Sequence, residues 1–66
     1  MINNAIERFK VTYENNKGYG VYYKNKNGSC YFYGVNINRH GIEVVNPSRK
    51  ISSNAYEFAK PYGVKF

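Results

Sequence analysis

The fold of this chain is decided by Lys17-Gly18-Tyr19-Gly20-Val21-Tyr22-Tyr23, followed by Cys30-Tyr31-Phe32-Tyr33-Gly34-Val35. Both segments are rich in aromatic and β-branched residues, which favour strands. The Asn27-Gly28 pair between them is a strong hairpin signal. The sequence therefore predicts two antiparallel strands, from Tyr19 to Lys24 and from Ser29 to Asn38, with a bend or bulge at Gly34.

Strand alternation sorts the side chains of this hairpin onto two sides. One consistent arrangement buries three side chains and displays three tyrosines. The buried set is Tyr22, Cys30 and Phe32, and the displayed set is Tyr19, Tyr31 and Tyr33. The alternative is that all these rings belong to the core, because a chain of this size needs large aromatic side chains to bury enough area.

The N-terminal segment fits two patterns. Helical spacing relates Ile2, Ala5, Ile6, Phe9 and Tyr13, and Asn4 and Glu7 are spaced as a capping pair. Strand spacing also relates Phe9, Val11 and Tyr13. A helical turn that leads into a strand from about Phe9 satisfies both patterns.

The C-terminal half contains a predicted strand, a helix and a final segment. Ile42 to Val45 reads as a strand that Asn46-Pro47-Ser48 interrupts. A helix is expected over Ser53–Lys60, with Ala55, Phe58 and Ala59 on one face and Pro61 as its stop. The final segment, 62–66, is expected to form a terminal strand or a packed tail.

Residues 1–66 are thus expected to form a single small domain that is mainly β. Its predicted architecture is a small antiparallel meander or partly open barrel of four to five strands, with one short C-terminal helix.

The net charge is strongly positive. The 66 residues include 10 Lys and Arg against 4 acidic residues, which gives a formal charge of +6. Such a balance favours polyanionic partners, of which phosphate backbones are the commonest. The candidate nucleic-acid contacts are Lys17, Tyr19, Lys24, Lys26, Tyr31, Tyr33, Arg49 and Lys50. Arg49 and Lys50 precede the predicted helix, so a phosphate held by them and by the Ser52-Ser53 region is a further expectation.

Two short motifs resemble the cold-shock domain, a five-stranded barrel that binds single strands. Its second-strand motif K-G-F-G-F-I is similar to residues 17–22, and its third-strand motif V-F-V-H-F is similar to residues 30–34. The resemblance covers Tyr13 to Val35. It implies that Tyr19, Tyr31 and Tyr33 match base-stacking positions and that Lys17 matches a basic loop residue.

The sequence offers little for catalysis. It contains one Cys and no Asp, and its single His lies in the turn Asn38-Arg39-His40-Gly41. A Cys30–His40 nucleophilic pair has nothing to orient it, and no cluster of metal ligands is present. We expect a protein that is not an enzyme and has no cofactor and no metal. The single Cys and the lack of an apolar run indicate a soluble, cytoplasmic protein without a membrane segment.

Three functions follow from these features. The first is a small binder of single-stranded DNA or RNA that uses tyrosine stacking and lysine contacts with phosphates. The second is an inhibitor or adaptor encoded by a phage or other mobile element, which binds an acidic or nucleic-acid-binding surface of a host protein. The third is a homodimer that pairs the exposed edges of two sheets.

Overall fold

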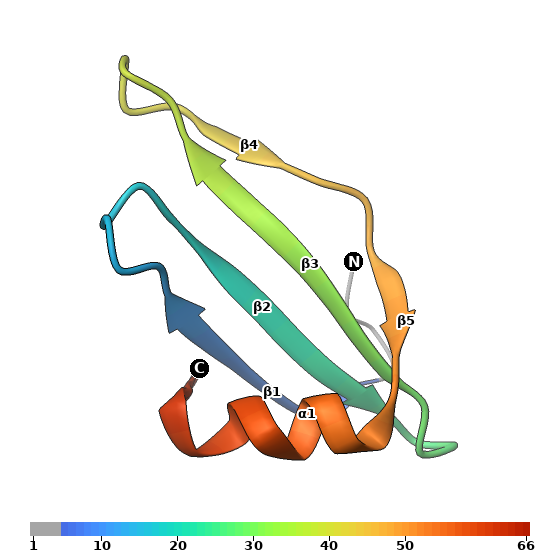
Figure 1. Cartoon of the computed structure of the whole chain (residues 1–66). Helices are drawn as coiled ribbons and strands as arrows, with labels where there is room; N and C mark the ends of the chain where they lie inside the picture. The colour runs from blue at the N-terminus through green and yellow to red at the C-terminus, as the bar shows by residue number, and fades with distance from the viewer. Residues whose placement is uncertain (1–4) are drawn as a thin grey trace.

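One antiparallel sheet and a short C-terminal helical segment make up residues 5–66, the part of the chain that the computed structural model describes (Figure 1). The strands are β1 (Ala5–Thr12), β2 (Gly18–Asn25), β3 (Cys30–Ile37), β4 (Glu43–Val45), β5 (Arg49–Ile51) and β6 (Val64–Lys65). The helix α1 (Ser53–Ala59) runs into a 3-10 turn, η1 (Lys60–Tyr62).

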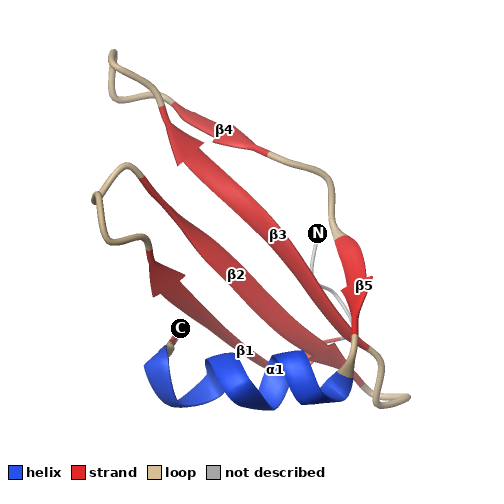
Figure 2. Cartoon of the chain, viewed as in Figure 1, coloured by secondary structure: helices blue, strands red, loops and turns tan. Residues whose placement is uncertain are grey.

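The strand order in the sheet is β4-β3-β2-β1-β6. The strand β5 pairs with the same edge of β3 as β4 does, at the other end of β3. All pairings are antiparallel, and the sheet is not closed into a barrel. Of the two predicted architectures, the meander is therefore the one observed. The mainly β fold with one short C-terminal helix is confirmed (Figure 2).

The ambiguous N-terminal segment is a strand. From Glu7 to Thr12, β1 pairs continuously with β2, and a bulge separates Ala5 from Glu7. The helical alternative is wrong for these residues, because alternation along β1 buries Phe9 to an exposed fraction of 1% and leaves its neighbour Lys10 exposed. The predicted contributions of Ile2 and Asn4 lie outside the described residues.

Asparagine side chains shape the three turns of the meander. The Oδ1 atoms of Asn15, Asn27 and Asn38 each accept a hydrogen bond from the backbone N–H two residues later, at 2.9 to 3.0 Å. This local bond is a common way for Asn to hold a turn. In the predicted β2–β3 hairpin, Gly28 has φ of 87° and donates its N–H to the Asn25 carbonyl at 2.9 Å. The hairpin prediction is confirmed.

The core lies between the sheet and α1, which crosses one end of the long strands (Figure 1). Phe9, Cys30 and Tyr56 are its buried members. The Phe9 ring stacks on the Tyr22 ring with centroids 5.0 Å apart, and it contacts the Tyr56 ring at 5.2 Å. The predicted burial of Cys30 is confirmed, whereas Tyr22 is half-buried on the same side of the sheet.

The buried face of α1 differs from the prediction. Tyr56 is completely buried and Ala59 packs against the core, but Ala55 is exposed and Phe58 is 76% exposed. A helix of seven residues has little surface of its own, so its rotation is set by its best long-range contact, the Tyr56 anchor. The Ser52 hydroxyl caps α1 by accepting a 3.1 Å hydrogen bond from the Ala55 N–H.

Two glycines in this core let rings approach the backbone. A Cβ on Gly63 would lie 2.0 Å from the Phe9 ring, and one on Gly34 would lie 2.9 Å from the Tyr13 hydroxyl. Of the bend or bulge predicted at Gly34, the bulge is wrong, since β2 and β3 pair in continuous register from Gly18–Asn36 to Lys24–Cys30. The predicted terminal strand is present as β6, which pairs with β1.

Neither helical segment of residues 5–66 has the length and apolar character that crossing a membrane requires.

Candidate nucleic-acid interface

Four tyrosines share the face of the sheet that points away from α1. β2 contributes Tyr19 and Tyr23, and β3 contributes Tyr31 and Tyr33, which lie on the same face because residues opposite each other in the register point the same way. We call these four side chains the tyrosine face. All four are partly exposed. Strand alternation predicts that three of them are displayed together: Tyr19, Tyr31 and Tyr33. The same alternation places Tyr23 beside them, although Tyr23 was not among the candidate contacts.

Two buried valines lie on this face as well. Val21 is 2% exposed and Val35 is 1% exposed, although α1 packs on the other side of the sheet. Their neighbours across the strands include Tyr33 beside Val21, and Tyr19 beside Val35. The tyrosine rings therefore have two roles, because they cover an apolar layer and keep part of their own surface in contact with water.

The rings are held in a defined arrangement. The Tyr23 and Tyr31 rings stack at 5.2 Å with an interplanar angle of 15°, and the Tyr33 ring is tilted against Tyr23 at 6.2 Å. Tyr19 donates a 3.2 Å hydrogen bond to Glu43, and Tyr23 donates one of the same length to the Ser48 hydroxyl. Each bond spans from β2 across β3 to the outer edge of the sheet, which restricts the orientation of the ring.

A groove lies next to these two bonds, since one partner of each, Tyr19 and Ser48, lines it. It has a volume of about 350 Å³ and is lined by Tyr19, Tyr33, Val35, Val45, Asn46 and Ser48. We call it the tyrosine groove. Burial raises the pKa of Tyr33 and, together with the hydrogen bond to Glu43, that of Tyr19. Both hydroxyls are therefore neutral at physiological pH, and the groove wall carries no tyrosinate charge.

Cations flank the tyrosine face on both sides. On β1, Arg8 lies opposite Tyr23, and Lys10 places its ammonium group 5.3 Å from the centre of the Tyr19 ring. On β5, Lys50 lies opposite Tyr31. Arg8 and Lys10 were not among the candidate contacts, although strand alternation along β1 puts them on this face.

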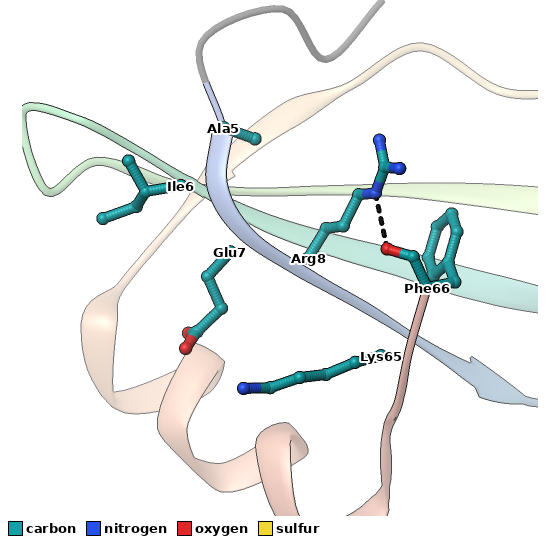
Figure 3. A pocket seen from close by; sticks show the side chains of 6 residues that line it. All are labelled: Ala5, Ile6, Glu7, Arg8, Lys65 and Phe66. Carbon is teal, nitrogen blue, oxygen red and sulfur yellow. Dashed lines mark hydrogen bonds between the residues drawn. The ribbon is translucent and has the colours of Figure 1, made fainter.

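A second pocket, of about 300 Å³, lies where β1 meets the C-terminal segment (Figure 3). There the Arg8 Nε donates a 2.8 Å hydrogen bond to the Phe66 carbonyl oxygen, and the guanidinium lies 5.0 Å from the centre of the Phe66 ring. The Lys10 ammonium lies 5.8 Å from the same ring. Phe66 therefore holds both cations at the border of the tyrosine face.

The lysines near the hairpin are not brought together. Lys17 and Lys26 are exposed in the turns at opposite ends of β2, roughly 30 Å apart for extended chain of this length. Lys24 lies on the α1 side, where it forms a 3.6 Å ion pair with Glu57 and lies 5.0 Å from the Tyr56 ring centre. Of these three candidates, none lies within the tyrosine face.

Arg49 and Lys50 belong to strand β5 and do not form a joint site at a helix start. The Arg49 guanidinium lies 5.5 Å from the centre of the Phe32 ring on the α1 side, whereas Lys50 belongs to the opposite face. The Ser52 hydroxyl already caps α1. The predicted phosphate site of these residues is therefore not assembled, and only Lys50 borders the tyrosine face.

The Cys30–His40 pair is not assembled either. Cys30 begins β3 and is buried, with its thiol 3.7 Å from the Gly28 carbonyl, while His40 is exposed in the turn beyond the far end of β3. Within the described residues 5–66, no three His, Cys, Asp or Glu side chains are grouped closely enough to hold a metal ion.

No protein-family model, curated protein or solved structure matches this chain. The resemblance to the cold-shock domain therefore stays a prediction.

Proposed function

We propose that this protein is a non-enzymatic binder of single-stranded DNA or RNA, which stacks bases on the tyrosine face. The observation that carries the proposal is the grouping of four partly exposed tyrosine rings on the face away from α1, with Arg8, Lys10 and Lys50 around them. Unpaired bases stack on such rings, whereas the bases of a duplex are already stacked on one another.

The expected energetics combine two terms. Each base stacked on an aromatic side chain contributes about 1–3 kcal/mol, and this contribution depends little on salt. Contacts of the three flanking cations with phosphates would release counterions, so log K should fall with log salt with a slope of about −2 for single strands. A salt-dependent and a salt-resistant part of the binding free energy are both expected.

The proposal is tested by fluorescence anisotropy with labelled single-stranded DNA and RNA, and with duplex controls, at two salt concentrations. The Tyr31→Leu/Tyr33→Leu variant removes two flat rings but keeps an apolar side chain opposite Val21. We expect it to bind single strands at least tenfold more weakly, in line with the loss of stacking. Leucine is preferred to alanine here because the valine layer stays covered.

The matched control is Phe58→Leu/Tyr62→Leu, which removes two rings that are 76% and 69% exposed outside the tyrosine face. It should bind as the unchanged protein does. Equal binding by the tyrosine-face variant and the unchanged protein would contradict the proposal, and so would binding that disappears for every oligonucleotide at moderate salt.

The exposed Phe58 and Tyr62 rings favour a second candidate function. Their centroids are 6.3 Å apart, and single-strand binding by the tyrosine face does not use them. Exposed aromatic pairs are typical of protein interfaces. This supports the alternative of an inhibitor or adaptor that binds a host protein or nucleoprotein. A partner that is retained after nuclease treatment, and lost with Phe58→Leu/Tyr62→Leu, would favour it.

A further inference from the structure

We propose that the tyrosine groove holds one unpaired nucleobase that carries an exocyclic amino group, such as cytosine or adenine, with Glu43 as the acceptor of that group. This inference rests on the proposed function and adds a position and a base preference to it. It follows from the shape of the groove, its lining and the hydrogen bond that joins the groove residue Tyr19 to Glu43.

The shape of the groove suits a flat aromatic ring. Its floor is Val35, which is 1% exposed, and its walls include the rings of Tyr19 and Tyr33. The volume of about 350 Å³ is at the lower end of the range of small-ligand pockets, about 300–1,000 Å³. A single base can therefore enter while its sugar and phosphates remain outside.

The charges around the groove favour a nucleic acid as the source of that ring. The Lys10 ammonium lies 5.3 Å from the Tyr19 ring on one side, and Lys50 lies opposite Tyr31 on the other. A strand whose base occupies the groove brings its neighbouring phosphates toward these cations. An aromatic side chain of a protein would supply no such anions.

The base preference comes from Glu43, which is hydrogen-bonded to the groove residue Tyr19. Glu43 and Val45 alternate on the same face of β4, and Val45 lines the groove. One Glu43 oxygen, Oε2, accepts the 3.2 Å hydrogen bond from Tyr19. A carboxylate has about four acceptor positions, so capacity remains for an amino group. Glu accepts from the N4 amino group of cytosine, whereas thymine and uracil present a carbonyl oxygen there, which a carboxylate repels.

The first experiment measures the base preference. Anisotropy at pH 7.5 compares the affinities for labelled oligo-dC and oligo-dT of twelve nucleotides, and we expect oligo-dC to bind about fivefold more tightly. Glu43→Ala should reduce this ratio to near one. Glu14→Ala, which changes the net charge equally at an exposed turn residue, should leave the ratio unchanged.

Tyr19→Phe separates the carboxylate from its tyrosine partner. This variant keeps the ring and Glu43 but removes the hydroxyl donor, so it should retain the preference for oligo-dC. Equal affinities in the unchanged protein, or a ratio that Glu43→Ala and Glu14→Ala alter equally, would overturn the base preference.

The second experiment fills the groove. Val45→Phe adds a ring at a groove residue that is 62% exposed, and Val44→Phe adds the same ring to the other face of the same strand. We expect Val45→Phe to weaken binding about tenfold, the loss of one stacked base, and Val44→Phe to leave it unchanged. Equal binding by the two variants would overturn the location.

The outcomes distinguish this inference from the proposed function. If the unchanged protein binds no single strand, both are overturned. If it binds, and Tyr31→Leu/Tyr33→Leu weakens binding while the Val45 and Glu43 variants have no effect, only the groove inference is overturned. Thermal melts of each variant establish that these comparisons are made on folded protein.

Discussion

The hydroxyl of Tyr56 donates a 2.7 Å hydrogen bond to the carboxylate of Glu7, which joins the middle of α1 to the beginning of β1. Tyr56 is completely buried, and its ring packs against Phe9. Burial first, and then the bond to Glu7, raises the pKa of Tyr56. The contact fixes how α1 is rotated on the sheet, so it determines which helix side chains face water.

The Tyr56 hydroxyl should stabilise the fold measurably. We expect Tyr56→Phe to lower the free energy of unfolding by about 1–2 kcal/mol, since hydrogen bonds to charged groups are stronger than neutral ones. Urea unfolding measures this change. Tyr62→Phe, at a residue that is 69% exposed, is the control and should leave the midpoint unchanged. Equal effects of the two substitutions would contradict this role for the hydroxyl.

Glu7 should make stability depend on pH in the acid range. The hydrogen bond from Tyr56, and then that from Lys60, lowers the pKa of Glu7 below its ordinary value of 4.5. Because the folded state favours the ionised carboxylate, this contribution is fully present above pH 4.5. It is lost as the pH falls from there through the lowered pKa of the folded state.

Glu7→Gln should therefore lower the free energy of unfolding at neutral pH. It should also reduce the amount by which this free energy falls between neutral pH and the acid range. Urea midpoints measured from pH 7 to pH 3 provide the comparison. Glu14→Gln, at an exposed turn residue, serves as the control and should keep the decline of the unchanged protein. A Glu7→Gln profile parallel to that of the unchanged protein would argue against the Glu7 contacts.

The valine layer beneath the tyrosine face should contribute to stability although α1 does not cover it. Val21→Ala removes two buried carbon atoms, so we expect a loss of about 1.5 kcal/mol in the free energy of unfolding. Val44→Ala, at a position that is 49% exposed, should change it by less than about 0.5 kcal/mol. Similar losses for both would mean that the tyrosine rings do not shield Val21.

The salt dependence of binding should separate lysines by the face they occupy. Lys10→Gln, at the tyrosine face, should reduce the magnitude of the slope of log K against log salt by about 0.7, the value for one phosphate contact with a single strand. Lys24→Gln removes the same charge on the α1 side, where Lys24 pairs with Glu57, and should leave the slope unchanged. Equal reductions would show that net charge, and not position, sets the slope.

The central hairpin could be predicted from the sequence because its signals are local. The Asn27-Gly28 signal locates the turn, which the Asn25 N–H closes with a 2.9 Å hydrogen bond to the Ser29 carbonyl, and the two-residue period then places Tyr19 and Tyr33 on one face. The same period assigns Lys24 to the other face, together with Tyr22. Lys24 was a candidate contact because of its positive charge alone, and charge does not indicate to which face of the sheet a side chain points.

Long-range contacts explain what could not be predicted. The chain returns to β3 after the break at Pro47, so Arg49 and Lys50 lie in a strand and point to opposite faces of the sheet, although α1 begins soon after them. The face of α1 depends on Tyr56 meeting Glu7 across the fold. The tyrosine groove likewise depends on residues of β2, β3 and the outer edge that only the folded chain brings together.

The order of the strands has a consequence for how the protein folds. β1, β2, β3 and β4 each pair with their neighbour in the chain, so these pairings close short loops, whereas α1 and β6 must reach back to β1. Short-loop contacts form early at small entropic cost. The surface that carries the tyrosines is thus expected to be assembled in the folding transition state, before the helix docks. Substitutions in the β2–β3 hairpin should slow folding, while those at Tyr56 should mainly speed unfolding.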